Sequence, residues 1–217
     1  MLWSLFVGAS LLNLIGVVCS TDVDETHQPT VELTSGVSIP LLGFGIGNLP
    51  HEQIFDVVHA QLKGSSSVVV DTAHASHNEK ILADAIADFD AHGDEHSHTR
   101  GGSSDSEDLP PIHVVTKVWY TMLGHERTKI SVEESLNELQ VASNTRQVYV
   151  HMLLHWPRCN DDIAWMNCER EENELPKHIK EAGPPPHRNK AKAFLESWIA
   201  LEVGAPVQYA YMIVPYC

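Results

Sequence analysis

Residues 112–119 read IHVVTKVW, and this stretch decides the predicted fold. Its mainly apolar, β-branched composition is typical of a strand that is buried on both faces of a parallel sheet. Two similar runs lie on either side of it in the chain, VVVD at 68–71 and VYVHMLLHW at 148–156. The sequence therefore predicts three buried strands.

Segments with helical periodicity separate these strands. Apolar residues recur at the spacing of one helix face in the segments 51–62, 78–89, 128–139 and 189–201. The alternation of strands and helices indicates a parallel sheet with crossover helices, either a doubly wound sheet or a (β/α)8 barrel. No G-x-G-x-x-G follows the first strand, which weakens the case for a doubly wound, dinucleotide-binding sheet.

Shorter elements are expected at the two ends of this alternation. Residues 31–49 predict a small hairpin that turns at Thr34-Ser35-Gly36, followed by a short buried strand over 41–45. The last residues, 203–217, form a divergent tail that offers at best a fifth strand over 207–214.

The N-terminus resembles a targeting segment. Residues 1–20 form an apolar run ending in Val18-Cys19-Ser20, which predicts a secretory signal peptide or, alternatively, an uncleaved membrane anchor. An acidic linker follows over residues 21–30. Either alternative directs the chain to the secretory pathway, as a lumenal, secreted or membrane-anchored protein.

Two polar insertions interrupt the predicted domain of residues 31–202, at 91–108 and 157–188. The second contains Cys159 and Cys168, which could form a disulfide in an oxidising compartment or remain free thiols. No metal site is predicted, because the histidines of the first insertion have nothing to fix their geometry.

The composition excludes some partners. The chain has 217 residues, of which 43% are hydrophobic and 20% charged, as in an ordinary globular domain. Its 14 basic and 29 acidic residues give a net charge of −15. So acidic a chain is not expected to bind nucleic acid, or a membrane beyond the N-terminal segment.

Three ionisable residues end three of the predicted strands: Asp71, Lys117 and His155. The carboxyl ends of parallel strands lie at one rim, where α/β proteins build their active sites. An Asp–Lys pair beside an imidazole would shift the pKa values of neighbouring groups. Alternatively, the three could form an ion pair and a core histidine with no catalytic role.

These residues and their neighbours resemble the aldo-keto reductases. The matching motifs are GVSIP with LGFG (36–45), DTA with NE (71–79), TKVW (116–119) and LHWP (154–157). The resemblance implies a TIM barrel and the NADPH-dependent reduction of a small-molecule aldehyde or ketone. In that family hydride passes from the nicotinamide to the carbonyl carbon, and a tyrosine protonates the developing alkoxide.

The resemblance also implies roles for individual residues. Asp71 and Lys117 are the pair that lowers the pKa of the tyrosine, and His155 orients the carbonyl. Trp119 and Trp156 match aromatic positions that line the substrate pocket, although both could instead pack in the core. The positions implied to contact the cofactor are Gly45, Ile46 and Asp71.

The sequence departs from the family at the tyrosine, because Ser76 occupies its place in the pattern. A serine hydroxyl is a much poorer acid. The flanking His74 and His77 could supply a proton or could simply face solvent.

A complete barrel needs about 250 residues. We therefore expect a partial (β/α)8 TIM barrel, about the first four to five β/α units, in a chain truncated relative to the family. Its open edges could favour self-association. Two functions remain open: an aldo-keto reductase-like oxidoreductase, and a non-catalytic pseudoenzyme or binding module that retains the fold.

Overall fold

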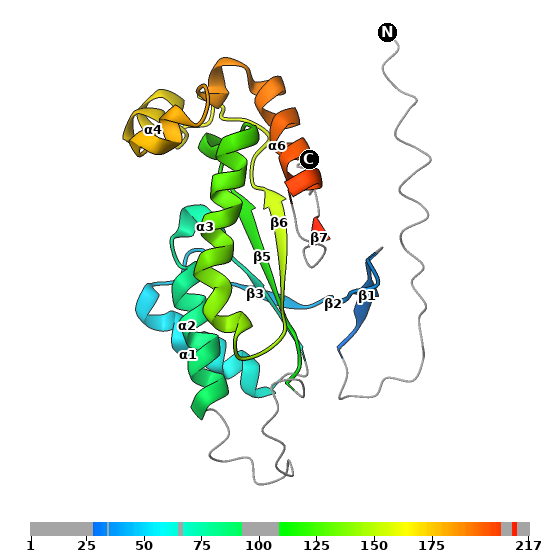
Figure 1. The fold of residues 1–217 in the computed structure, drawn as a ribbon. Helices are drawn as coiled ribbons and strands as arrows, with labels where there is room; N and C mark the ends of the chain where they lie inside the picture. The colour runs from blue at the N-terminus through cyan, green and yellow to red at the C-terminus, as the bar shows by residue number, and fades with distance from the viewer. Residues whose placement is uncertain (1–27, 34, 65–66, 93–108, 205–209, 212–217) are drawn as a thin grey trace.

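The computed structural model describes residues 28–33, 35–64, 67–92, 109–204 and 210–211 (Figure 1). Several predicted segments lie wholly or mostly outside these residues. They are the signal peptide or anchor (1–20), the acidic linker (21–30), the first insertion (91–108) and the tail (203–217).

The described chain is built on a parallel sheet of five strands in the order β3-β4-β5-β6-β7. They are β3 (Gly43–Gly45), β4 (Val68–Asp71), β5 (Ile112–Val118), β6 (Val148–Leu154) and β7 (Ala210–Tyr211). Each strand lies beside the next strand in the chain, without the reversal that a doubly wound sheet requires. Of the two folds predicted from the alternation of strands and helices, a doubly wound sheet and a (β/α)8 barrel, the strand order therefore favours the barrel.

Helices follow the strands in the same sequential way. They are α1 (His51–Gly64), α2 (Glu79–His92), α3 (His125–Ser143) and α6 (Lys190–Gly204), each within a few residues of its predicted bounds. Contacts join α1 to α2, α2 to α3 and α3 to α6, so the helices form a layer in the order of the strands (Figure 1). None of the described helices combines the length and the apolar character needed to cross a bilayer.

A two-stranded hairpin precedes the sheet. Strand β1 (Thr30–Glu32) pairs antiparallel with β2 (Ser38–Pro40), which confirms the predicted hairpin. Gly36 has a φ of 79°, a left-handed conformation that favours glycine in the turn.

The prediction of a strand over residues 41–45 is confirmed for residues 43–45, but the prediction that this strand is buried is wrong. Strand β3 contains only three residues, Gly43 to Gly45, which are exposed or partly buried. Leu41 and Leu42, which precede it, are 59% and 66% exposed. The reason is that β3 pairs only with β4 among the described strands, and does so very closely. A Cβ added to Gly43 would lie 2.8 Å from the carbonyl oxygen of Val69.

The second polar insertion (157–188) is also more ordered than a loop. It contains α4 (Cys168–Glu174), α5 (Lys177–Glu181) and the 3-10 helix η4 (Pro186–Arg188). Arg127 of α3 and Glu172 of α4 form a buried ion pair, with two N–H donors each 2.8 Å from a carboxylate oxygen. This pair ties the insertion to α3.

Candidate active site

The carboxyl ends of β4 and β5 bring Asp71 and Lys117 into contact. The Lys117 Nζ donates to both carboxylate oxygens of Asp71 and to the carbonyl oxygen of Thr72, each at 2.7 Å. These three bonds use all the hydrogens of the ammonium group. The Lys117 side chain is 16% exposed and that of Asp71 is 51% exposed, so the carboxylate remains accessible from the cleft.

His155 follows β6 directly, and its backbone N–H donates to the carbonyl oxygen of Val118 at 3.0 Å. Burial, and to a smaller extent the charge of Lys117, lower the pKa of the imidazole to about 4, against the opposing effect of Asp71. The ring is therefore neutral at pH 7. Its Nδ1 is buried without a partner among the described residues. Because an orphaned buried donor is rarer than an orphaned acceptor, the tautomer with its hydrogen on Nε2 is favoured.

A cleft of about 760 Å³ opens beside these groups. Its lining includes the charged side chains of Asp71 and Lys117. Its lining also includes the indole rings of Trp119, Trp156 and Trp165. The ring of Trp119 meets His155 edge to face, with the centroids 4.9 Å apart. The arrangement can hold a polar group beside the ions and a flat apolar group against the indoles.

Ser76 and Gly45 also line this cleft. Ser76 ends the short 3-10 helix η1 (His74–Ser76). A Cβ added to Gly47 would lie 3.4 Å from the Ser76 hydroxyl, so the segments after β3 and β4 meet here. Ser76 thus lines the same cleft as the Asp71–Lys117 pair.

Ile46 lies elsewhere, because its side chain is fully buried in the core. Its backbone N–H donates to the carbonyl oxygen of Asp71 at 2.9 Å, and its carbonyl oxygen accepts from the Asn78 amide at 3.0 Å. These bonds hold the segment after β3 against the end of β4. Ile46 is therefore not among the residues that line the cleft, although its backbone is bonded to the end of β4.

The two histidines that flank Ser76 do not line the cleft. His74 Nε2 lies 2.9 Å from a carboxylate oxygen of Glu134 on α3. His77 is exposed and has a positive φ of 50°. Neither histidine is placed to donate a proton to a group bound beside Lys117.

Glu79 supports the site from behind. It is 1% exposed and accepts hydrogen bonds from the hydroxyls of Thr116 on β5, at 2.6 Å, and Ser135 on α3, at 3.1 Å. Burial raises the pKa of this carboxyl, and the two hydroxyl hydrogen bonds oppose that rise. Glu79 thus ties α2 to the strand that carries Lys117.

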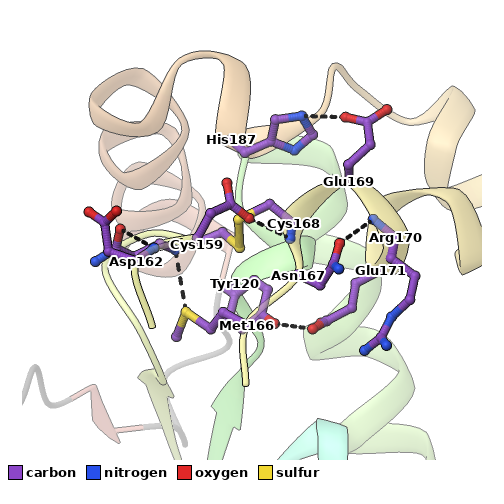
Figure 2. Close-up of a disulfide and its surroundings, with 12 residues drawn as sticks. Tyr120, Cys159, Asp162, Met166, Asn167, Cys168, Glu169, Arg170, Glu171 and His187 are labelled. Carbon is purple, nitrogen blue, oxygen red and sulfur yellow. Dashed lines mark hydrogen bonds and ion pairs between the residues drawn. A yellow bond between two sulfur atoms is a disulfide. The ribbon is translucent and has the colours of Figure 1, made fainter. Parts of the chain in front are cut away.

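The second insertion supplies site residues for which the sequence analysis had no prediction. Cys159 and Cys168 form a disulfide, as one of the two alternatives predicted (Figure 2). Trp165 lies between them and lines the cleft. Glu171 accepts from Trp119 Nε1 at 3.2 Å and from the Tyr120 hydroxyl (Figure 2 shows the second bond). The only local signal was a tryptophan between two cysteines in a polar stretch.

The fold and the site together define a class: a β/α-barrel protein whose strand ends carry a lysine–aspartate pair and a neutral histidine beside an aromatic cleft. Proteins with similar sequences narrow the class further. The chain is 31% identical over 129 residues to two proteins named aldo-keto reductase, from Mycobacterium sp. strains KMS and JLS. The match covers 59% of this chain and 39% of each relative.

Solved structures agree on the fold. An aldo-keto reductase from Brucella melitensis matches with a TM-score of 0.51 and 22% identity, over 86% of this chain and 53% of that one. A Bombyx mori aldo-keto reductase, solved in complex with NADP, matches with a TM-score of 0.51 and 18% identity, over 86% of this chain and 50% of that one. No protein-family profile matches the chain.

The chain is therefore aldo-keto reductase-like in sequence and has part of the (β/α)8 barrel of that family. It spans about two fifths of the length of the curated relatives that it matches, and about half of the solved structures.

Proposed function

We propose that this chain reduces an aldehyde or ketone to an alcohol with NADPH as the hydride source. The observation that carries the proposal is the Lys117–Asp71 pair beside a neutral His155 in an aromatic cleft. The likeness to aldo-keto reductases, one of them solved with NADP, supports the choice of reaction and cofactor.

The cleft residues fit a nicotinamide ring and a carbonyl group. Gly45 and Gly47 line the cleft without side chains of their own, and the exposed carboxylate of Asp71 can accept from amide or hydroxyl groups. The indoles offer flat apolar surfaces to a planar ring. Gly45 and Asp71 would hold the cofactor, whereas Ile46 does not line the cleft. The chemistry that the cofactor supplies when bound is hydride.

His155 and Lys117 act on the carbonyl oxygen in this proposal. The neutral imidazole donates a hydrogen bond from Nε2 and so orients and polarises the carbonyl. The ammonium of Lys117, held in place by Asp71, stabilises the negative charge that develops on this oxygen. A cation that is only 16% exposed acts strongly here, because little water screens it.

Ser76 is the group at the cleft that would pass a proton to the developing alkoxide. Its hydroxyl is a weaker acid than a tyrosine phenol, whose pKa is about 10. We therefore expect turnover to be slow and limited by protonation.

A second function is favoured by the same residue. With serine in the proton-donating position and every hydrogen of Lys117 already bonded, the cleft would suit a non-catalytic binding module that holds a dinucleotide or a carbonyl compound. This function differs from the first in one measurable respect: it predicts binding without turnover.

We also propose that the protein works in an oxidising compartment. The Cys159–Cys168 disulfide supports this location, because such bonds persist mainly in secreted and lumenal proteins.

The test is NADPH oxidation by the full chain with an aromatic aldehyde, followed by absorbance. Replacement of Lys117 by Met is expected to lower kcat about 100-fold, as for the loss of one group that stabilises a developing oxyanion. Lys80→Met is the matched control, because Lys80 pairs with Asp84 on the exposed face of α2. Equal rates in Lys117→Met and the wild type would contradict the reductase, and NADPH binding without turnover would support the binding module.

A further inference from the structure

We propose that Cys159, Cys168 and Asp161 bind a Zn²⁺ ion when the disulfide between the two cysteines is reduced. The site lies in the second insertion (157–188), and none of its three residues lines the cleft. It uses no group of the proposed reaction, so the inference is independent of the proposed function.

Three side chains of the kinds that bind zinc converge at the start of α4. The sulfur atoms of Cys159 and Cys168 and a carboxylate oxygen of Asp161 all lie within 4.8 Å of one another. Donor atoms on one tetrahedral zinc ion, with bonds of about 2.0–2.3 Å, lie about 3.5–4 Å apart. Small rotations of the reduced side chains would therefore bring all three donors onto one ion.

The fold holds the two cysteines close together and away from water. Their Cα atoms are 5.9 Å apart, and their side chains are 3% and 2% exposed (Figure 2). They are nine positions apart in the chain, which is further than the close cysteine pairs of common zinc motifs. The spacing alone therefore does not indicate a zinc site, and the tertiary structure does.

The backbone holds Asp161 beside the cysteines. Its Oδ1 accepts from the backbone N–H of Cys168 at 3.0 Å. A carboxylate has further lone pairs, so this bond leaves the group able to bind a metal ion as well. Asp161 is exposed, which allows an ion to enter and water to complete its fourth position.

Hydrogen bonds that do not depend on the disulfide shape the same segment. The sulfur of the buried Met166 accepts from the backbone N–H of Asn160 at 3.3 Å. The side chain of Asn167 caps α4 by accepting from the backbone N–H of Arg170 at 2.9 Å (Figure 2). We therefore expect the segment between the cysteines to keep its course when the S–S bond is broken.

The donor set favours zinc over the common hard cations. Ca²⁺ and Mg²⁺ take oxygen ligands, whereas Zn²⁺ accepts thiolates together with a carboxylate. Two buried thiolates beside a carboxylate would place three negative charges together, which is unfavourable without a cation. The thiols of Cys159 and Cys168 are thus expected to keep their protons until the metal displaces them.

Reduction and metal binding are two balanced steps. Two molecules of a monothiol give two electrons and two protons to the disulfide, which becomes two thiols, and they leave joined as their own disulfide. Binding of Zn²⁺ then releases the two protons of the cysteine thiols. In the reverse direction a small-molecule disulfide takes two electrons from the two thiolates, closes the Cys159–Cys168 bond and frees Zn²⁺. In an oxidising compartment the zinc form therefore belongs to the chain before its cysteines are oxidised.

The experiment titrates Co²⁺, as a substitute for Zn²⁺, into the full chain reduced with a phosphine under argon. Cobalt bound to thiolate absorbs in the near ultraviolet through sulfur-to-metal charge transfer, which separates this site from histidine or carboxylate sites elsewhere. The reduced wild type is expected to show this band and to lose it when Zn²⁺ is added. The oxidised chain is expected to show none. Absence of the band from the reduced wild type would overturn the proposal.

Two variants test which residues bind the ion. Cys159→Ser/Cys168→Ser is expected to abolish the band. Asp161→Asn, which keeps both cysteines, is expected to weaken Co²⁺ binding at least about tenfold, since even the loss of an outer-shell partner costs about 10- to 100-fold. Asp162→Asn is the matched control, because its exposed carboxylate is the next in the chain and lies outside the donor group. A band that persists in the cysteine variant, or equal affinities in the two aspartate variants, would overturn the assignment.

Alkylation of the thiols gives a second readout that needs no variant. In the reduced wild type, Zn²⁺ is expected to slow the reaction of Cys159 and Cys168 with iodoacetamide at least about tenfold, because a metal-bound thiolate is a poorer nucleophile. Peptide mass spectrometry measures the two rates separately. Ca²⁺ is the control and should leave both unchanged. Equal rates with and without Zn²⁺ would refute the site.

Discussion

Acidification from pH 7 to pH 5 is expected to destabilise the fold through two buried histidines on neighbouring strands. His113 of β5 and His151 of β6 are 0% and 2% exposed. Their rings are stacked, and His113 Nδ1 lies 3.0 Å from His151 Nε2. One hydrogen between the two nitrogens satisfies both, so a second proton would place a charge in the core.

The size of the effect follows from the pKa of His113. Burial lowers this pKa to about 4, from an ordinary value of 6.5, and burial lowers the pKa of His151 as well. At a pH between about 4 and 6.5 the unfolded chain binds a proton at His113 that the folded chain does not, so the free energy of unfolding decreases as the pH falls. At pH 5 the loss from His113 alone is about 2 kcal/mol relative to pH 7, and His151 adds to it.

Urea unfolding at pH 7, 6 and 5 measures this loss. The double variant His113→Phe/His151→Phe removes both titrating rings and keeps an aromatic side chain at each position. It is expected to lose at least about 2 kcal/mol less than the wild type over this range. His155 and Glu79 titrate in both chains, so their contributions cancel in the comparison.

His92→Phe is the control, because its side chain is 75% exposed, and it should follow the wild type. Parallel stability curves for the double variant and the wild type would refute the reasoning.

Three further predictions concern single residues. Ser76→Tyr is expected to raise kcat for NADPH oxidation at least about tenfold by supplying a better acid, and an unchanged rate would argue against a proton-donating position. Glu79→Ala should cost about 2–4 kcal/mol in urea unfolding because two buried hydroxyls lose their acceptor, while a loss below about 0.5 kcal/mol would contradict this role. Glu172→Gln leaves the Arg127 charge buried and unpaired, and should cost about 3–5 kcal/mol. Glu174 forms an exposed ion pair with Arg170 and provides the control. Glu174→Gln should lower the free energy of unfolding by less than about 1 kcal/mol.

The strand ends could be predicted from the sequence because neighbouring residues in the chain show both where a buried strand lies and where it ends in an ionisable side chain. An apolar run that stops at Asp71, Lys117 or His155 marks both a buried strand and a polar rim. The helices could be predicted for the same reason, since each buries one regular face. The order of the strands could not, because barrels and doubly wound sheets have the same alternation along the chain. The order in which β3 to β7 pair in the sheet distinguishes the two folds.

The second insertion shows where pattern analysis fails. Its charged residues indicate a solvated loop, yet Glu172 is buried because Arg127 neutralises it, and Glu171 is bonded to two aromatic side chains. All three partners lie 45 or more residues away in the chain, so no local periodicity reports them. The role of Trp165 was missed for the same reason. Its contacts come from the ends of other strands.

The histidine pair illustrates a related limit. His113 and His151 stand inside apolar runs, and the sequence alone places each in a buried strand. Their pairing depends on the register of β5 and β6, which sets His151 opposite Val115, two residues from His113. A buried polar residue can thus be located from the sequence before its partner is known.

Hydride transfer itself is the measurement that tests the central claim most directly. NADPH carrying deuterium at the transferred position of the nicotinamide is incubated with the full chain and 2-naphthaldehyde, and the alcohol is analysed by mass spectrometry. The account predicts an alcohol with one deuterium on its carbinol carbon, formed by the wild type and Lys80→Met and lost in Lys117→Met. Absence of deuterated alcohol from the wild type, with NADPH demonstrably bound, would contradict the reductase and leave the binding module as the function of this cleft.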